Sequence, residues 1–174
     1  MFKRIAAVAP TAAMLSACVS APPNPLDTAT RQGTYVKDAA VIWSVDDTKR
    51  GDNPAYVEGK ADVLAKLEAA VEEQFKTSPA GSVPVNFKID VKSYSRVGAA
   101  MGNLIGGSNM VVADVTVVRE ADGAELGTYK AVTGMYASNG GLIGLAVQAA
   151  SKPDVPQVMA NSFATNLRAR FDGK

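Results

Sequence analysis

The clearest feature of the chain is a stretch from 85 to 92 in which apolar and polar residues alternate without a break. Successive side chains of a strand point to opposite faces, so this alternation predicts a β-strand with one buried and one exposed face. The buried face would hold Val85, Phe87, Ile89 and Val91, and the exposed face Asn86, Lys88, Asp90 and Lys92.

Three further stretches have β-forming character. Residues 35–45 include a β-branched and aromatic run that ends at two aspartates. Residues 110–119 are apolar on both faces except at Asp114 and Thr116, which predicts a strand in the middle of a sheet. A tight turn at 121–123 follows, so residues 125–136 are expected to return as the hairpin partner.

Two stretches repeat apolar residues every three or four positions, the spacing of one helix face. The first begins at Asn53-Pro54, a capping residue and a proline suited to a first turn, and predicts a helix of about 22 residues. The second begins at Asp154, a second capping residue. The apolar positions are Ala61, Leu64, Leu67, Val71 and Phe75 in the first helix, and Val155, Met159, Phe163, Leu167 and Phe171 in the second.

The order of elements over residues 34–174 is therefore strand, helix, strand, strand, strand, helix. Each helix has one apolar stripe, and a sheet with one apolar face offers both helices a common surface. We expect an α+β fold, a two-layer sandwich of a mainly antiparallel four-stranded sheet and two amphipathic helices. Helices on both faces are disfavoured by the polar side of residues 85–92. Trp43, the single tryptophan, is expected in the core.

The first 18 residues have a different character. A short positive segment, Met1 to Arg4, precedes the uncharged apolar stretch Ile5 to Leu15. This arrangement is typical of a secretory signal and is too short for a permanent membrane helix. The sequence Leu15-Ser16-Ala17-Cys18 that follows resembles the bacterial lipobox. The resemblance implies cleavage before Cys18, a diacylglycerol on its thiol and acylation of the new amine.

The domain organisation follows from this boundary. Residues 1–17 are expected to be the signal peptide, and residues 18–33 a lipidated cysteine followed by a flexible linker rich in proline and small polar residues. The folded domain is expected over residues 34–174. The residues directly after Cys18 are Val19 and Ser20, and neither is an aspartate. Since an aspartate there retains lipoproteins of enteric bacteria in the inner membrane, its absence favours the periplasmic face of the outer membrane.

The composition excludes several kinds of catalytic and metal-binding site. The sequence has no histidine and Cys18 is its single cysteine, so histidine-based catalysis, zinc sites of the His or Cys type and a disulfide within the chain are excluded. Removal of the signal peptide with Lys3 and Arg4 reduces the 18 basic side chains to 16, against 17 acidic ones. Such a balance gives no reason to expect nucleic acid as a partner. We expect no metal, no cofactor and no enzymatic activity.

Two glycine-rich segments, 98–107 and 140–144, lie before and after the expected hairpin. We expect them to be loops over one end of the sheet, with apolar side chains that contact a partner protein or lipid. The contact residues would be Met101, Leu104, Ile105, Leu142 and Ile143. Both segments also contain the Gly-x-x-x-Gly spacing, so the alternative is a glycine zipper that drives self-association or membrane contact.

Asp114 is an acid within an apolar strand. We expect it on the solvent face or paired with Lys130 across the hairpin, and the alternative is a catalytic acid of an enzyme acting on cell wall or lipid. Motifs for phosphate binding and for an assembled active site are absent from the sequence.

The whole pattern resembles the small proteobacterial lipoproteins classed as domains of unknown function. The matching features are the lipobox, the alternating strand that ends at Ser95-Arg96, the glycine-rich stretch before Val111 to Val118, the turn at Asp122-Gly123 and the closing helix. The resemblance implies an α+β module of an envelope accessory protein. It leads us to expect a lipid-anchored, non-enzymatic module that binds an envelope protein or itself.

Overall fold

The computed structural model describes residues 23–46, 54–76, 81–95, 107–138 and 153–174. Within them lie, in chain order, α1 (Thr28–Gly33), β1 (Thr34–Trp43), α2 (Pro54–Phe75), β2 (Val83–Ser95), β3 (Gly107–Arg119), β4 (Glu125–Ser138) and α5 (Val155–Asp172). The two long helices and the four strands are those that the periodicity predicts. The short helix α1 lies in the stretch expected to be a linker.

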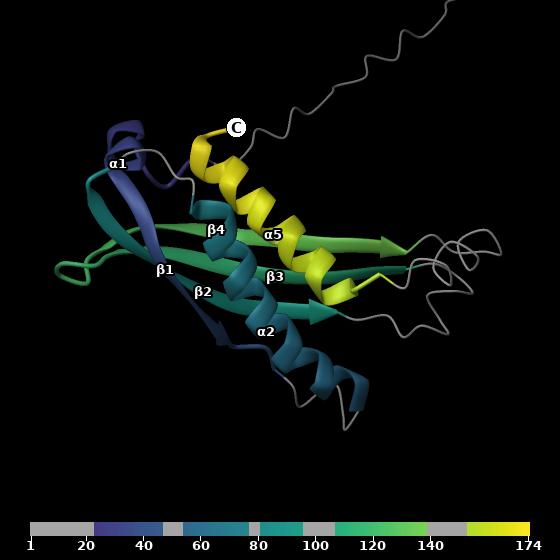
Figure 1. Cartoon of the computed structure of the whole chain (residues 1–174). Coiled ribbons are helices and arrows are strands. Elements are labelled where there is room, and N and C mark those ends of the chain that lie inside the picture. Colours follow the sequence, from purple (N-terminus) through teal and green to yellow (C-terminus); the bar gives the residue numbers. More distant parts are fainter. Residues whose placement is uncertain (1–22, 47–53, 77–80, 96–106, 139–152) are drawn as a thin grey trace, which may run out of the picture.

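The four strands form one sheet in the order β1-β2-β3-β4. Helices α2 and α5 lie side by side on the same face of this sheet, and no helix of the described residues lies over the opposite face (Figure 1). Together they make the predicted two-layer α+β sandwich. Strand β3 pairs with both β2 and β4, as its apolar character on both faces indicates.

The sheet is mainly antiparallel, as expected, but it is mixed because one of its pairs is parallel. Strands β2, β3 and β4 are antiparallel neighbours, but β1 pairs with β2 in parallel, from Thr34↔Val83 to Trp43↔Val91. The length of α2 explains this. Its 22 residues extend about 33 Å at 1.5 Å per residue, which matches the length of the ten-residue strand β1. The helix therefore returns the chain to the end where β1 began, and β2 starts in the same direction.

The core lies between the sheet and the two helices. The four apolar side chains predicted to be inward on β2 are fully buried, and so are those of β3 that share their face. Strand β3 contributes Val111, Ala113, Val115 and Val117. Trp43 packs against this core from its margin and is half-buried, with its ring edge-to-face on Tyr94 at 5.5 Å between centroids.

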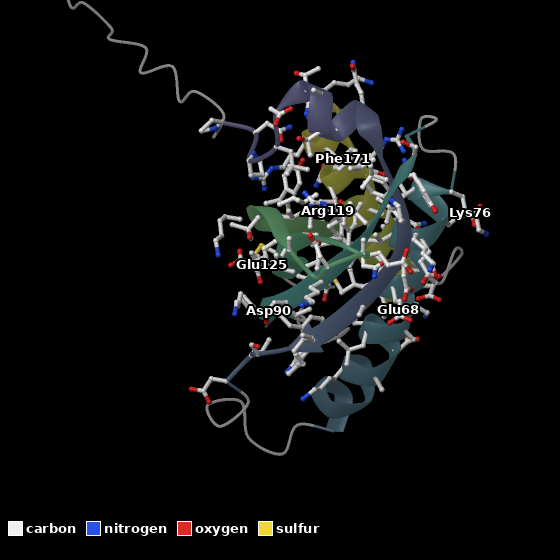
Figure 2. All side chains as sticks on the ribbon, turned by 90° about the vertical axis from the view of Figure 1, so that its left-hand side faces the viewer. Glu68, Lys76, Asp90, Arg119, Glu125 and Phe171 are labelled. Atoms are coloured by element: carbon white, nitrogen blue, oxygen red, sulfur yellow. The ribbon has the colours of Figure 1, made fainter. Side chains whose placement is uncertain are left out.

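Phe171, on the last turn of α5, is the meeting point of the layers. Its ring lies edge-to-face on Phe75 of α2 at 5.5 Å and on Phe87 of β2 at 5.9 Å, and is tilted against Tyr129 of β4 at 6.2 Å between centroids. Figure 2 shows Phe171 beneath α1, at the end of the molecule where the described chain begins. Aromatic pairs of this kind add about 0.5–1.5 kcal/mol each beyond the burial of their area.

The described part of the expected linker is bound to the domain, which corrects the prediction for residues 23–33. Leu26 is buried in the core with 3% of its surface exposed. Asn24 donates to the carbonyl of Arg170 at 2.5 Å and accepts from the Tyr129 hydroxyl at 3.0 Å. Arg31 donates to the carbonyl of Phe171 at 2.9 Å. We call residues 23–33 the N-terminal strap.

Side chains of α5 cover the outer edge of β4. Asn166 donates to the Thr133 carbonyl at 2.7 Å, and Arg170 donates to the Lys130 carbonyl at 2.7 Å. Ser162 accepts from the Met135 amide at 3.3 Å. These three side chains are spaced by four residues, so they form one row along the helix. Backbone groups of an edge strand can recruit strands of other chains, and this row occupies three of them.

The close approach of α5 to β4 gives the first prediction. A Cβ on Gly134 would lie 2.3 Å from the Met159 carbonyl oxygen and 2.7 Å from Cβ of Phe163, so Gly134→Ala forces α5 away from the sheet. We expect the free energy of unfolding in urea to fall by about 1–3 kcal/mol. Gly33→Ala is the control, because a Cβ there meets nothing within 4 Å, and it should stay within about 0.5 kcal/mol. Equal stabilities of the two variants would contradict this packing.

Candidate functional site

The predicted lipidation site and partner-contact residues lie outside the described residues. They are Cys18, Met101, Leu104, Ile105, Leu142 and Ile143. The described strands nevertheless fix where the segments with the five contact residues are attached. Ser95, the last residue of β2, pairs with Met110, and Gly107, the first residue of β3, pairs with Ser138, the last of β4. Segments 96–106 and 139–152 are therefore attached to the same end of the sheet, which we call the loop end.

The outer face of the sheet is apolar at the loop end. Met110 lies opposite Met135 on β4, and both point away from the helices, because their neighbours Val111 and Gly134 point toward them. Met135 is 48% exposed. Val112 lies on the same face, between the two methionines and the centre of the sheet, and is half-buried. We call Met110, Val112 and Met135 the outer patch.

The outer patch is not among the contact surfaces expected from the sequence. The pattern that indicates this patch is the presence of apolar residues on both faces of residues 110–119. That pattern predicts a central strand, and it also predicts an apolar outer face. A central strand is covered on both sides by neighbours in the sheet, but its outer face still needs a cover of its own. At the loop end no described element supplies that cover (Figure 1).

The centre of the outer face is charged. Asp90 of β2 lies directly opposite Asp114 of β3, and two such carboxylates repel each other. Each has a lysine partner, since Lys92 forms an ion pair with Asp90 and Lys130 forms one with Asp114 at 2.9 Å. Hydrogen bonds from Lys92 and Ser44 hold the pKa of Asp90 below its usual value. Figure 2 shows Asp90 on the side of the sheet opposite Glu68 and Lys76 of α2.

Asp114 stabilises a β-bulge between β3 and β4. One carboxylate oxygen pairs with Lys130, as the sequence predicted, and the other accepts from the backbone amide of Ala131 at 2.9 Å. Ala131 has φ of 50°, a left-handed conformation that costs energy for a residue with a Cβ. The strand register shifts beside it, between Ala113 and Val115. The carboxylate therefore fixes the bulge, and both of its oxygens are in use.

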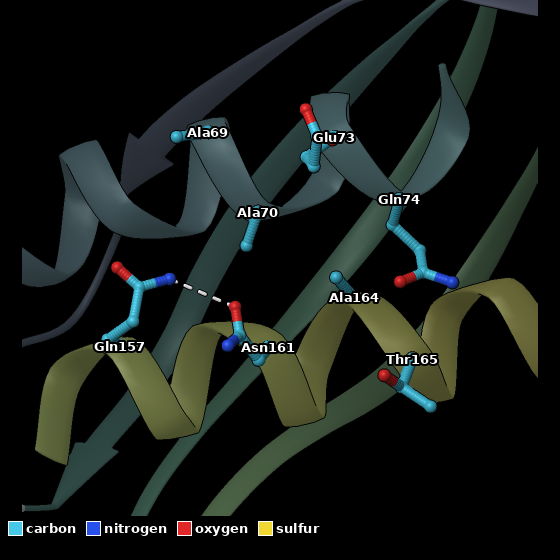
Figure 3. Close-up of a pocket in the computed structure, with 8 residues that line it drawn as sticks. All are labelled: Ala69, Ala70, Glu73, Gln74, Gln157, Asn161, Ala164 and Thr165. Atoms are coloured by element: carbon cyan, nitrogen blue, oxygen red, sulfur yellow. Dashed lines mark hydrogen bonds between the residues drawn. The ribbon is translucent and has the colours of Figure 1, made fainter. Parts of the chain in front are cut away.

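A groove of about 410 Å³ lies between α2 and α5 (Figure 3). Ala70 and Ala164 form its floor, where the two helices come close because neither side chain extends beyond a methyl group. Gln157 donates to Asn161 at 2.9 Å along one wall. The carboxylate in its lining, Glu73, is paired with Lys76 at 2.5 Å. The groove follows from the packing of small residues and assembles no reactive group.

Two further observations limit the chemistry of the described residues. Within these ranges, no three acidic or sulfur- or imidazole-bearing side chains lie close enough together to hold a metal ion. No helix in the described part of the chain has the length and apolar character that crossing a membrane requires.

The strap creates a second surface that the sequence did not predict. A hollow of about 490 Å³ lies at the C-terminal end of α5, and its lining includes Pro23 and Asn24 of the strap. The charged side chains that line it are Lys130, Arg170 and Lys174. We call this the basic hollow. No periodicity relates residue 24 to residue 170, so the sequence offered no signal for it.

Comparison with known proteins assigns no family. No family model matches the chain, and no curated protein matches it. Among solved structures, it is similar to a candidate lipoprotein from Caulobacter crescentus CB15, with 14% identity over 83% of this chain and 91% of the other and a TM-score of 0.43.

Two other similar structures come from further bacteria. A DUF330 protein from Xanthomonas campestris has 14% identity over 85% of this chain and 91% of its own, with a TM-score of 0.44. A PelC dodecamer from Paraburkholderia phytofirmans has 10% identity over 88% of this chain and 95% of its own, with a TM-score of 0.40. Identities and TM-scores of this size assign no function to this chain.

The role of Asp114 gives a prediction with a defined pH dependence. Burial alone raises the pKa of Asp114, but the hydrogen bonds from Lys130 and the Ala131 amide outweigh it and hold the pKa below the ordinary 3.8. The charged carboxylate therefore stabilises the fold at pH values above about 4, and this contribution is lost as the pH falls through the lowered pKa.

We expect Asp114→Ala to lower the free energy of unfolding at pH 7 by about 1 kcal/mol, the scale of one lost hydrogen bond. Asp114→Asn keeps an acceptor for Ala131 and should lose less. Between pH 7 and pH 3 the stability of Asp114→Asn should fall less steeply than that of the wild type, as measured by urea unfolding at each pH. Parallel pH profiles for the wild type and Asp114→Asn would show that the carboxylate does not have this role.

Proposed function

We propose that this chain is a bacterial envelope lipoprotein, anchored by lipid on Cys18, whose α+β domain is a non-enzymatic module that binds another envelope component. The observation that carries the proposal is the signal segment that ends in Leu15-Ser16-Ala17-Cys18. The thiol that receives lipid in such signals is the single cysteine of the chain. Each buried CH₂ of an acyl chain contributes about 0.8 kcal/mol, so two or three chains hold a protein on a membrane.

The short chain between Cys18 and the folded domain supports an anchor that holds the domain at the membrane. The strap begins at Pro23, and Asn24 is already hydrogen-bonded to α5 and β4. The chain between Cys18 and Pro23 spans at most about 18 Å, since each residue reaches no more than about 3.6 Å. An anchor at Cys18 therefore keeps the domain beside the membrane and does not suspend it on a long linker. The absence of an aspartate after Cys18 supports the outer membrane as its location.

The loop end is the surface that we assign to the partner. The outer patch exposes apolar area there, beside the attachment points of the two segments that contain Met101, Leu104, Ile105, Leu142 and Ile143. Contiguous apolar surface on a protein of this size favours an interaction site. Strand β4 offers little of its edge for pairing with another strand, because the α5 row covers it, so we assign recognition to side chains.

A non-enzymatic role is supported by the use of Asp114. One of its oxygens accepts from the Ala131 amide and the other from Lys130, and its lowered pKa keeps it charged at neutral pH, whereas a general acid needs a proton to donate.

The anchor is tested by metabolic labelling with palmitate in cells that express the chain. The wild type should incorporate the label and partition into the detergent phase, while Cys18→Ala should lose the label and remain as the longer, uncleaved precursor. Ser16→Thr is the control, since it changes a small residue of the same segment and leaves the thiol in place. An unlabelled wild-type protein would disprove lipidation at Cys18.

The partner surface is tested by co-purification from detergent-solubilised membranes. A protein recovered with the wild type should be lost with Met135→Ser combined with Met101→Ser and Leu142→Ser. Ile42→Ser is the matched control, because Ile42 is 52% exposed on the outer face of β1, at the opposite edge of the sheet. Retention of the partner by the triple variant, or its equal loss with Ile42→Ser, would contradict an interaction at the loop end.

A further inference from the structure

We propose that the basic hollow binds the phosphate headgroups of anionic phospholipids in the membrane that holds the anchor. The inference rests on the proposed anchoring at Cys18 for its geometry, and it concerns a surface at the other end of the molecule from the loop end. Its evidence is the charge of the hollow, the state of Arg170 and the place where the strap begins.

Three residues that line the hollow have cationic side chains, and none is an aspartate or a glutamate. Lys130, Arg170 and Lys174 contribute the charged side chains, beside the strap residues Pro23 and Asn24. The side chains of Lys130 and Lys174 are 73% and 77% exposed. With a volume of about 490 Å³, the hollow is large enough for a phosphate group and its ester substituents.

Arg170 is oriented but not neutralised. Its guanidinium donates to the Lys130 carbonyl at 2.7 Å and lies over the Tyr129 ring at 5.8 Å. No carboxylate of the described residues lies within ion-pair distance of it, whereas Arg119 pairs with Asp122 at 2.9 Å and Arg168 with Asp172 at 3.0 Å. A guanidinium presents five N–H donors in a planar fork that matches a phosphate. Arg170 therefore has donors to spare for an anion.

The two lysines add positive charge on side chains that can reorient. Lys130 pairs with Asp114 at 2.9 Å, and Lys174 lies 3.7 Å from Asp172, which already pairs with Arg168. Both ammonium groups are exposed, and each carboxylate keeps another partner if its lysine turns toward a phosphate, since Asp114 also accepts from the Ala131 amide and Asp172 also pairs with Arg168.

The hollow lies where the anchor must be. Pro23 and Asn24 line it, and the chain from Cys18 reaches at most about 18 Å before it arrives there. A lipidated Cys18 would therefore hold this end of the domain closest to the headgroups. Cationic side chains within about one Debye length, roughly 8–10 Å, of an anionic surface are attracted to it.

The experiment uses a chain that starts at residue 19 and so has no anchor. Among the described residues, every buried member of the hydrophobic core lies between Leu26 and Phe171, so this chain keeps that core. Binding to vesicles of equal parts phosphatidylglycerol and phosphatidylcholine is measured by co-sedimentation. A thermal melt of each variant confirms that it is folded.

We expect the wild-type domain to bind these vesicles and to bind far less to pure phosphatidylcholine. Each cation near an anionic membrane is worth about a fivefold change in binding, so Lys130→Gln with Lys174→Gln should weaken binding about 25-fold, and Arg170→Gln about fivefold or more. Lys37→Gln with Lys88→Gln is the matched control, since it removes the same charge from β1 and β2, and it should weaken binding by less than about threefold.

Three results would overturn the proposal. They are no binding to anionic vesicles, equal binding to neutral vesicles, and equal weakening by the two double variants, which would mean that only the net charge matters. The test is independent of Cys18, so failure of palmitate labelling and failure of vesicle binding are separate outcomes.

Discussion

The packing of Phe171 is the contact on which the rest of the structure depends. Its ring joins α2, β2 and β4, and the backbone carbonyls beside it accept hydrogen bonds from the strap. Both helices lie on one face of the sheet because their apolar stripes meet around this residue. The strap is held because the same turn of α5 leaves carbonyls for Asn24 and Arg31 to bind. Burial raises the pKa of Tyr129 to about 12, so its hydroxyl stays protonated and donates to Asn24 at any physiological pH.

The periodic elements could be predicted from the sequence because their physical cause is local. The alternation of residues 85–92 and the four-residue repeat from Val155 to Phe171 each reflect one buried face, and both predictions are confirmed. The parallel pairing of β1 with β2 was not predicted, because it depends on the length of α2 relative to β1. The strap was predicted wrongly because Leu26 is the one large apolar residue of residues 23–33, and a single residue has no period.

The candidate surfaces also differ in whether the sequence could predict them. Pairing of Asp114 with Lys130 was predictable, because a hairpin of known turn fixes which residues are neighbours. The basic hollow was not, because it is made by residues from the strap, β4 and α5 that meet only in the folded chain. The two surfaces also lie apart. From Lys130 to Ser138, strand β4 extends about 26 Å at 3.3 Å per residue, so the lipid-facing end and the partner-facing end that we propose do not compete for the same space.

The hydrogen bonds between the strap and α5 join the two ends of the described chain and so form late in folding. Asn24 binds a residue 146 positions further along the chain, and Arg31 binds one that is 140 positions further. Tyr129 of β4 can bind Asn24 earlier along the chain, but the two carbonyl acceptors of the strap become available only when the last turn of α5 has formed. Closure of the last helix completes the core and fixes the strap against it in one late, long-range step, the kind of step that makes folding slow.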